Sequence, residues 1–165
     1  MAATARAQLV LVLGLMAAAT AVRAEPIAIV VAADWTEAVE VSLPELRAVY
    51  LGRQSQLFTQ NVKPIDLASG SPARAGFSRS VLGRSESALE RYWIEQALMG
   101  GGLPPRQLGE DRAVLEAVRS QRGAIGYVAW SSIGDGVDGV RVLGIVSRGT
   151  ALAPADAGYA IHLDE

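Results

Sequence analysis

The sequence predicts an α/β fold in which one sheet is covered by helices. Three observations predict this fold: short β-branched runs typical of buried strands, longer segments with apolar residues at helical spacing, and an alternation of the two along the chain. The chain has 165 residues, of which 50% are hydrophobic and 19% are charged, so its composition is that of a folded domain with a packed core. We expect a single domain.

The first 24 residues have the pattern of a secretory signal peptide. Arg6 precedes an apolar run of about 14 residues, which is the length of a signal-peptide core and short for a membrane span. Cleavage is expected after Ala24, Ala21 offers a second site, and an uncleaved anchor is the alternative. An exported chain without cysteine has no disulfides, so its stability must come from its core. We therefore expect a periplasmic protein that is not membrane-anchored after cleavage.

The first strand and the first helix are predicted at the start of the domain. Residues 27–32 form a short β-branched run that is typical of a buried strand. Ser42 and Glu45 have the spacing of a capping box, which begins a helix that Gly52 ends. The apolar residues of this helix fall on one face: Leu43, Leu46, Val49 and Tyr50.

The second strand and the second helix follow. Residues 62–67 predict a strand, and Pro64, which has no backbone N–H, is expected at a sheet edge or near a strand end. Ser71 is the expected N-cap of the next helix, because Pro72 suits the first helical position. Gly83 is expected to end this helix.

Two more helices are predicted in the middle of the chain. Ser87 and Glu90 have capping-box spacing and predict a helix that runs toward Gly100. Residues 100–105 (GGGLPP) cannot continue it. A fourth helix is expected over residues 110–121, with two acidic residues at its positive end.

The last predicted strands are residues 123–128 and 140–146. We interpret residues 134–139 between them as a hairpin turn, because they lack the oxygen spacing and the terminal Glu of a calcium loop. Residues 151–165 are expected to form a tail that frays or adds an edge strand. The apolar residues that alternate in this tail are Tyr159, Ile161 and Leu163.

The residue counts exclude most kinds of chemistry. A net charge of −2 gives no reason to expect a nucleic-acid partner. With no cysteine and a single histidine, His162 near the carboxyl end, the chain has few ligands for zinc or copper and no well-placed base for a Ser-His-acid triad. No complete nucleotide-binding glycine motif is found. We therefore expect a protein that is not an enzyme and uses no metal or cofactor.

One segment has the pattern of an anion-binding site. Residues 69–72 (SGSP) follow a predicted strand and begin a helix, so unpaired backbone N–H groups and two hydroxyls can converge at the positive end of the helix dipole. The alternative is an ordinary helix N-cap, since serine is a common capping residue.

Several segments, taken in order, resemble the phosphate-binding substrate-capture proteins of ABC transporters. The matching segments are residues 45–52 (ELRAVYLG), residues 69–71 (SGS) with Phe77 after them, Tyr92-Trp93, and residues 123–128 (GAIGYV). The resemblance covers residues 26–146 and one lobe of a two-lobed protein. It implies one lobe of a type II periplasmic-binding-protein-like fold, with a mixed sheet covered by helices, over residues 25–150.

The resemblance also implies where a ligand would bind. It carries the family's Ser-Gly-Thr loop onto Ser69, Gly70 and Ser71, where serine replaces threonine and keeps the hydroxyl. The arginine that the family has four residues before this loop falls on Ile65, which cannot donate a hydrogen bond. Arg74 is the candidate substitute, and the alternative for Arg74 is a solvated side chain, because a cation in the first turn opposes the helix dipole.

Two functions are expected from these residues. The first is an exported solute-binding module, resembling the phosphate-binding component of an ABC transporter, that holds phosphate or a similar small oxyanion weakly. Its expected partners are a transporter permease and, as a homodimer, a second copy that closes the site. The second is a ligand-free interaction module that docks to an envelope protein.

Overall fold

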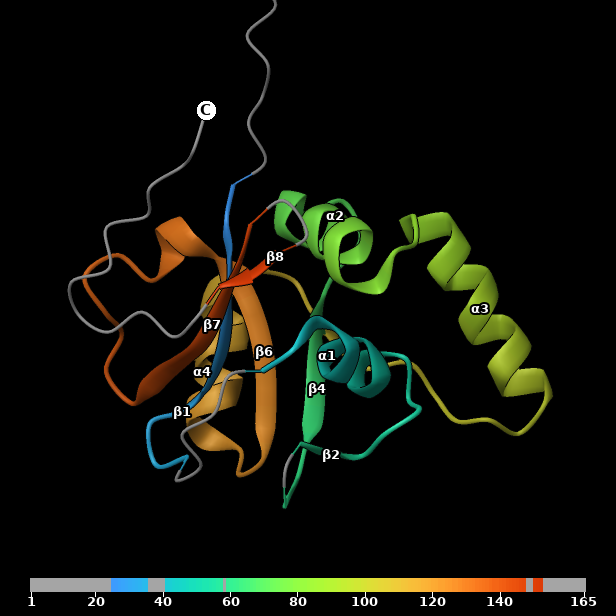
Figure 1. Cartoon of the computed structure of the whole chain (residues 1–165), viewed down its shortest axis with the longest axis horizontal. Coiled ribbons are helices and arrows are strands. Elements are labelled where there is room, and N and C mark those ends of the chain that lie inside the picture. Colours follow the sequence, from blue (N-terminus) through green and yellow to red (C-terminus); the bar gives the residue numbers. More distant parts are fainter. Residues whose placement is uncertain (1–24, 36–40, 58, 148–149, 153–165) are drawn as a thin grey trace, which may run out of the picture.

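The structure is a computed structural model that describes residues 25–35, 41–57, 59–147 and 150–152 (Figure 1). Within these residues, six strands form one mixed sheet in the order β5-β4-β6-β1-β7-β8. The strands of this sheet are β1 (Ile27–Ala32), β4 (Lys63–Leu67), β5 (Arg106–Leu108), β6 (Ala124–Ala129), β7 (Val140–Ser147) and β8 (Thr150–Leu152). A separate hairpin pairs β2 (Gln56–Leu57) with β3 (Gln60–Asn61).

The sheet has parallel and antiparallel neighbours. β4 pairs parallel with both β5 and β6, whereas β1 pairs antiparallel with both β6 and β7. Because β1 lies between β6 and β7, residues 134–139 join two strands that are not neighbours. The interpretation of residues 134–139 as a hairpin turn is therefore wrong. The mixed sheet with helices against it confirms the predicted fold class.

Helices cover both faces of the sheet (Figure 1). They are α1 (Leu43–Tyr50), α2 (Pro72–Phe77), α3 (Glu86–Leu98) and α4 (Asp111–Ser120), with a π-helical turn η1 (Ser78–Leu82) after α2 and a 3₁₀ turn η2 (Trp130–Ser132) after β6. Neighbouring residues of β6 point to opposite faces. Gly126 faces α4, whereas Tyr127 stacks on Phe77 of α2 and contacts Tyr50 of α1. α4 therefore covers one face, and α1 and α2 cover the other.

α4 packs closely on the sheet because β6 has a glycine beneath it. A Cβ at Gly126 would lie 2.5 Å from Cγ1 of Val114 and 3.2 Å from Cγ2 of Val118. Both valines are buried. The missing side chain at Gly126 thus allows α4 and β6 to approach each other.

α3 begins two residues earlier than predicted. Its N-cap is Ser85, whose Oγ accepts a hydrogen bond from the amide of Ala88 at 3.3 Å. The predicted capping box of Ser87 and Glu90 is therefore wrong. The sequence pattern does not distinguish the two serines, because a serine at either position fits it. α3 lies beside the sheet and extends away from it (Figure 1). Its buried residues are Leu89 and Trp93.

The remaining local predictions are largely confirmed. The strands predicted over residues 27–32, 62–67, 123–128 and 140–146 correspond to β1, β4, β6 and β7, and α1 has the full capping box. Pro64 is the second residue of β4, which confirms the strand-end expectation. The edge expectation is wrong, because β4 lies between β5 and β6. β5, which follows the break at residues 100–105, was not predicted.

Some predictions fall outside the described residues. Residues 1–24 and 153–165 lie there, so the signal peptide and the alternation of Tyr159, Ile161 and Leu163 stay predictions. β8 pairs antiparallel with β7 as the last strand of the sheet and ends at Leu152. In the part of the chain that the structure describes, no helix combines the length and apolar character needed to cross a membrane.

Candidate functional site

The Ser-Gly-Ser loop (residues 69–71) lies at the carboxyl end of β4, directly before α2. β5 ends at the same edge of the sheet, where the amide of Ala68 donates to the carbonyl of Leu108 at 2.7 Å. The first two residues of the loop are exposed, and Ser71 is half-buried. Open α/β sheets usually bind their ligands at the carboxyl ends of the strands. The loop therefore lies at the carboxyl ends of β4 and β5, where a ligand site is expected.

The loop leaves hydrogen-bond donors at the surface. Gly70 has a φ of +90°, which favours glycine, and no atom lies within 4 Å of the position that a Cβ would take. Ser71 then caps α2, because its Oγ accepts a hydrogen bond from the amide of Arg74 at 3.4 Å. The amides of Ser69 and Gly70 donate to no residue that the structure describes. Both amides are thus available to a ligand.

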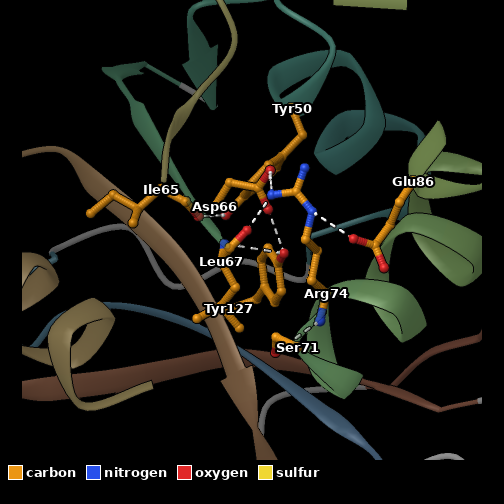
Figure 2. A network of polar contacts seen from close by, with 8 residues as sticks. All are labelled: Tyr50, Ile65, Asp66, Leu67, Ser71, Arg74, Glu86 and Tyr127. Atoms are coloured by element: carbon orange, nitrogen blue, oxygen red, sulfur yellow. Dashed lines mark hydrogen bonds and ion pairs between the residues drawn. The ribbon is translucent and has the colours of Figure 1, made fainter. Parts of the chain in front are cut away.

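Arg74, the fourth predicted site residue, lies inside the molecule. It is 2% exposed, and its guanidinium group pairs with the Asp66 carboxylate at 2.7 Å and donates to the carbonyl of Leu67 (Figure 2). Its Nε lies 3.3 Å from the Glu86 carboxylate, and the side-chain amide of Gln107 lies 3.0–3.1 Å from its terminal nitrogens. The prediction of a solvated Arg74 is therefore wrong, because oxygens from β4 and α3 hold the charged group in the interior.

Asp66 is at the centre of this buried network. One of its oxygens pairs with Arg74, and the other accepts a hydrogen bond from the hydroxyl of Tyr127. Burial raises the pKa of Asp66 above its ordinary value, while the Tyr127 hydroxyl and the Arg74 guanidinium oppose the rise. Burial and the neighbouring Asp66 also raise the pKa of Tyr127. The Tyr127 hydroxyl therefore stays protonated and donates to Asp66.

Tyrosine hydroxyls fill the space where β4 and β6 separate. The two strands pair only over the first two residues of β4. Beyond them, Oη of Tyr50 lies 3.1 Å from the carbonyl oxygen of Ile65 and 3.2 Å from that of Ile125. The amide of Leu67 donates to Oη of Tyr127 at 3.4 Å. Side chains thus satisfy backbone groups that a continuous ladder would otherwise pair.

The buried network holds the loop at both of its ends. Asp66 and Leu67 end the strand before the loop, and Arg74 lies in the first turn of the helix after it. The ion pair and the hydrogen bond between them therefore restrain the loop from both sides. A loop that is already ordered loses less entropy when a ligand binds. The arrangement can present two amides and two serine hydroxyls to a small oxyanion.

Sequence reasoning missed Asp66, Tyr127 and Glu86 as members of this network. The available signal was Asp66 itself, because an acidic residue between two apolar strand residues, Ile65 and Leu67, needs a partner when it is buried. No spacing rule identifies Arg74 as that partner, since the two residues lie on different elements.

Comparisons with known proteins relate this fold to solved structures. No family model and no curated protein matches the sequence. An ABC-type phosphate transport receptor from Vibrio cholerae has a TM-score of 0.52 and 15% identity, over 73% of this chain. A protein from Clostridium perfringens, assigned as a phosphate ABC transporter substrate-binding protein and solved with bound phosphate, has a TM-score of 0.55 and 17% identity, over 78% of this chain. A protein from Planctomyces limnophilus, assigned to phosphate binding, has a TM-score of 0.52 and 10% identity, over 82% of this chain.

The chain spans about half the length of these proteins: it covers 46% of the first and 48% of each of the other two. Identities this low show a likeness of fold. The mixed sheet and its helices therefore form a fold that this chain shares with about half of each of these solute-binding proteins, in agreement with the family that its motifs resemble.

Proposed function

We propose that this chain is an exported solute-binding module that holds phosphate or a similar small oxyanion at the Ser-Gly-Ser loop. The observation that carries the proposal is that Ser69 and Gly70 are exposed residues whose amides donate to no described residue. The hydroxyls of Ser69 and Ser71 lie on the same short loop. Amide and hydroxyl donors are the groups that bind an oxyanion in a backbone concavity. The fold shared with a protein solved with bound phosphate supports the same ligand class.

Arg74 has a positioning role in this proposal and does not contact the anion. Its guanidinium is bound to Asp66, to Glu86 and to a backbone carbonyl, so its charge is used inside the molecule. Ile65, at the position where the resembled family has an arginine, is buried and apolar. The loop therefore offers uncharged donors alone. Each hydrogen bond to the charged anion contributes about 1.5–3 kcal/mol, and the loop lacks the bonds that an arginine would add, so we expect weak binding by the isolated chain.

A second surface is expected to complete the site. Ser69 and Gly70 are exposed, so an anion bound to the loop of the isolated chain would remain in contact with water. A second copy, forming a homodimer, or a transporter permease would supply further donors and exclude water from the bound anion. Lower water content strengthens each electrostatic contact, so the closed assembly would bind more tightly than the isolated chain.

Calorimetric titration of the purified protein with inorganic phosphate and with sulfate tests the proposal. We expect saturable binding with a millimolar or lower dissociation constant. Ser71→Asp is expected to abolish binding and keep the fold, because aspartate still caps α2 while its charge repels an anion. Ser42→Asp makes the same exchange at the N-cap of α1 and is expected to bind like the wild type. No binding at millimolar anion, or unchanged binding by Ser71→Asp, would contradict the proposal.

A second candidate function is the interaction module that docks to an envelope protein. An exposed apolar surface over the second half of α3 and the segment after it favours this function, because such surfaces often mark protein contacts. Its exposed side chains are Ile94 (61%), Leu98 (83%), Met99 (71%) and Leu103 (82%). This second function would be favoured if the titration showed no anion binding, and if the protein bound to isolated cell envelopes while the Leu98→Ser variant did not.

A further inference from the structure

A second group of basic side chains surrounds a hollow of about 500 Å³, formed by different residues from those of the Ser-Gly-Ser loop. Arg47 of α1, Arg53 after α1, and Arg84 between η1 and α3 line this arginine hollow. Its lining contains no acidic side chain. The whole chain has a net charge of −2, whereas the three arginines make the hollow a region of positive charge.

The charges of these three arginines are not neutralised within the described residues. The ion pairs found there belong to other arginines: Arg74, Arg112 and Arg119. Glu86, which follows the hollow's Ser85 in the chain, turns toward Arg74 (Figure 2). The hollow therefore keeps three positive charges that an anion could neutralise.

Two of the arginines are held in place by neighbouring groups. Nε of Arg47 donates to the carbonyl of Val81 at 2.7 Å, which leaves its terminal amino groups unpaired among the described residues. The guanidinium carbon of Arg84 lies 4.9 Å from the centre of the Tyr92 ring. Tyr92 is itself fixed by a 2.8 Å hydrogen bond to the carbonyl of Leu51. Side chains that are already ordered lose less entropy on binding a ligand.

The size and the donors of the hollow indicate the class of ligand. A volume of about 500 Å³ lies within the range of small-molecule sites and exceeds what one small oxyanion needs. Planar guanidinium groups match the oxygens of phosphate groups in pairs. Ser85 adds the N-cap of the 13-residue α3 to the same lining. We propose that the arginine hollow binds a small soluble anion with two or more phosphate groups, through Arg47, Arg53 and Arg84.

The proposal does not rest on the Ser-Gly-Ser loop, and titration of the purified protein with inorganic pyrophosphate tests the two sites separately. Arg53→Gln together with Arg84→Gln is expected to weaken pyrophosphate binding about 100-fold, at about tenfold for each lost contact. Arg112→Gln removes one positive charge, as each single exchange does, from a side chain that is 91% exposed and outside the hollow, so its affinity should match the wild type. Ser71→Asp should remove only the weak binding of pyrophosphate by the loop and keep the tighter site of the hollow.

Two results would overturn the proposal. One is the absence of saturable pyrophosphate binding by the wild type at millimolar concentration. The other is equal binding by the Arg53→Gln/Arg84→Gln and Arg112→Gln variants. Arg53 is exposed, so Arg53→Gln alone should keep the fold and still weaken binding about tenfold if the double variant does not fold. Loss of pyrophosphate binding in Ser71→Asp but not in the arginine variants would also overturn it, because the anion would then occupy the loop.

Discussion

Replacing Arg74 with methionine perturbs the buried network most directly. Methionine keeps much of the side-chain volume but removes the guanidinium group, so the Asp66 carboxylate stays buried with Tyr127 as its remaining side-chain partner. The carbonyl of Leu67 loses its donor in the same step. Removing one partner of a buried ion pair costs about 3–5 kcal/mol, and we expect Arg74→Met to lower the free energy of unfolding by this amount.

The cost is expected to depend on Asp66. Asp66→Asn alone leaves Arg74 beside Glu86 and should cost about 1–3 kcal/mol. The double variant Arg74→Met/Asp66→Asn has no unpaired carboxylate at position 66. Its loss of unfolding free energy should therefore be smaller than the sum of the two single losses by about 0.5–3 kcal/mol. Urea unfolding at neutral pH, followed by far-UV circular dichroism, measures all three free energies.

An exposed arginine provides the matched control. Arg112→Met changes a side chain that is 91% exposed and should alter the free energy of unfolding by no more than about 0.5 kcal/mol. A cost below about 1 kcal/mol for Arg74→Met, or single costs that simply add, would refute the coupling of Arg74 with Asp66.

Two further predictions concern the pH dependence and the packing of the fold. Because burial raises the pKa of Asp66 above its ordinary value of 3.8, loss of its proton destabilises the folded state. The wild type should therefore lose stability relative to Asp66→Asn as the pH rises from below 3.8 through the folded-state pKa of Asp66. Urea unfolding of both proteins over this pH range measures the difference between their free energies of unfolding. A difference that stays constant or grows in favour of the wild type would contradict the prediction. Gly126→Ala should cost about 1–3 kcal/mol, because its Cβ would lie 2.5 Å from Val114 on α4. Gly109→Ala, where a Cβ meets nothing within 4 Å, is the control, and equal thermal stability of the two variants would show that α4 can move away.

The elements that could be predicted from the sequence have local signals. The capping box of Ser42 and Glu45 lies within one helical turn, and the β-branched run of β1 needs no distant contact to be recognised. The order of strands has no such signal. Insertion of β1 between β6 and β7 is decided by pairing between distant segments, and for this reason residues 134–139 could not be assigned correctly.

The candidate site shows the same division between local and distant contacts. The Ser-Gly-Ser loop could be located because its strand, its glycine and its helix cap follow one another in the chain. The burial of Arg74 could not be predicted, because a charged side chain is ordinarily placed at the surface. Its partners Asp66 and Glu86 come from β4 and α3, and only packing of those elements against α2 brings the three charges together.

The most direct test of the proposed oxyanion site is to follow the backbone amide chemical shifts of the isotope-labelled protein during titration with inorganic phosphate. We predict that the largest saturable shifts occur at Ser69 and Gly70, whose amides are unpaired, with smaller shifts at Arg74, whose amide is bound to Oγ of Ser71. Absence of saturable shifts at residues 69–71, or shifts confined to the residues around the arginine hollow, would contradict the proposal.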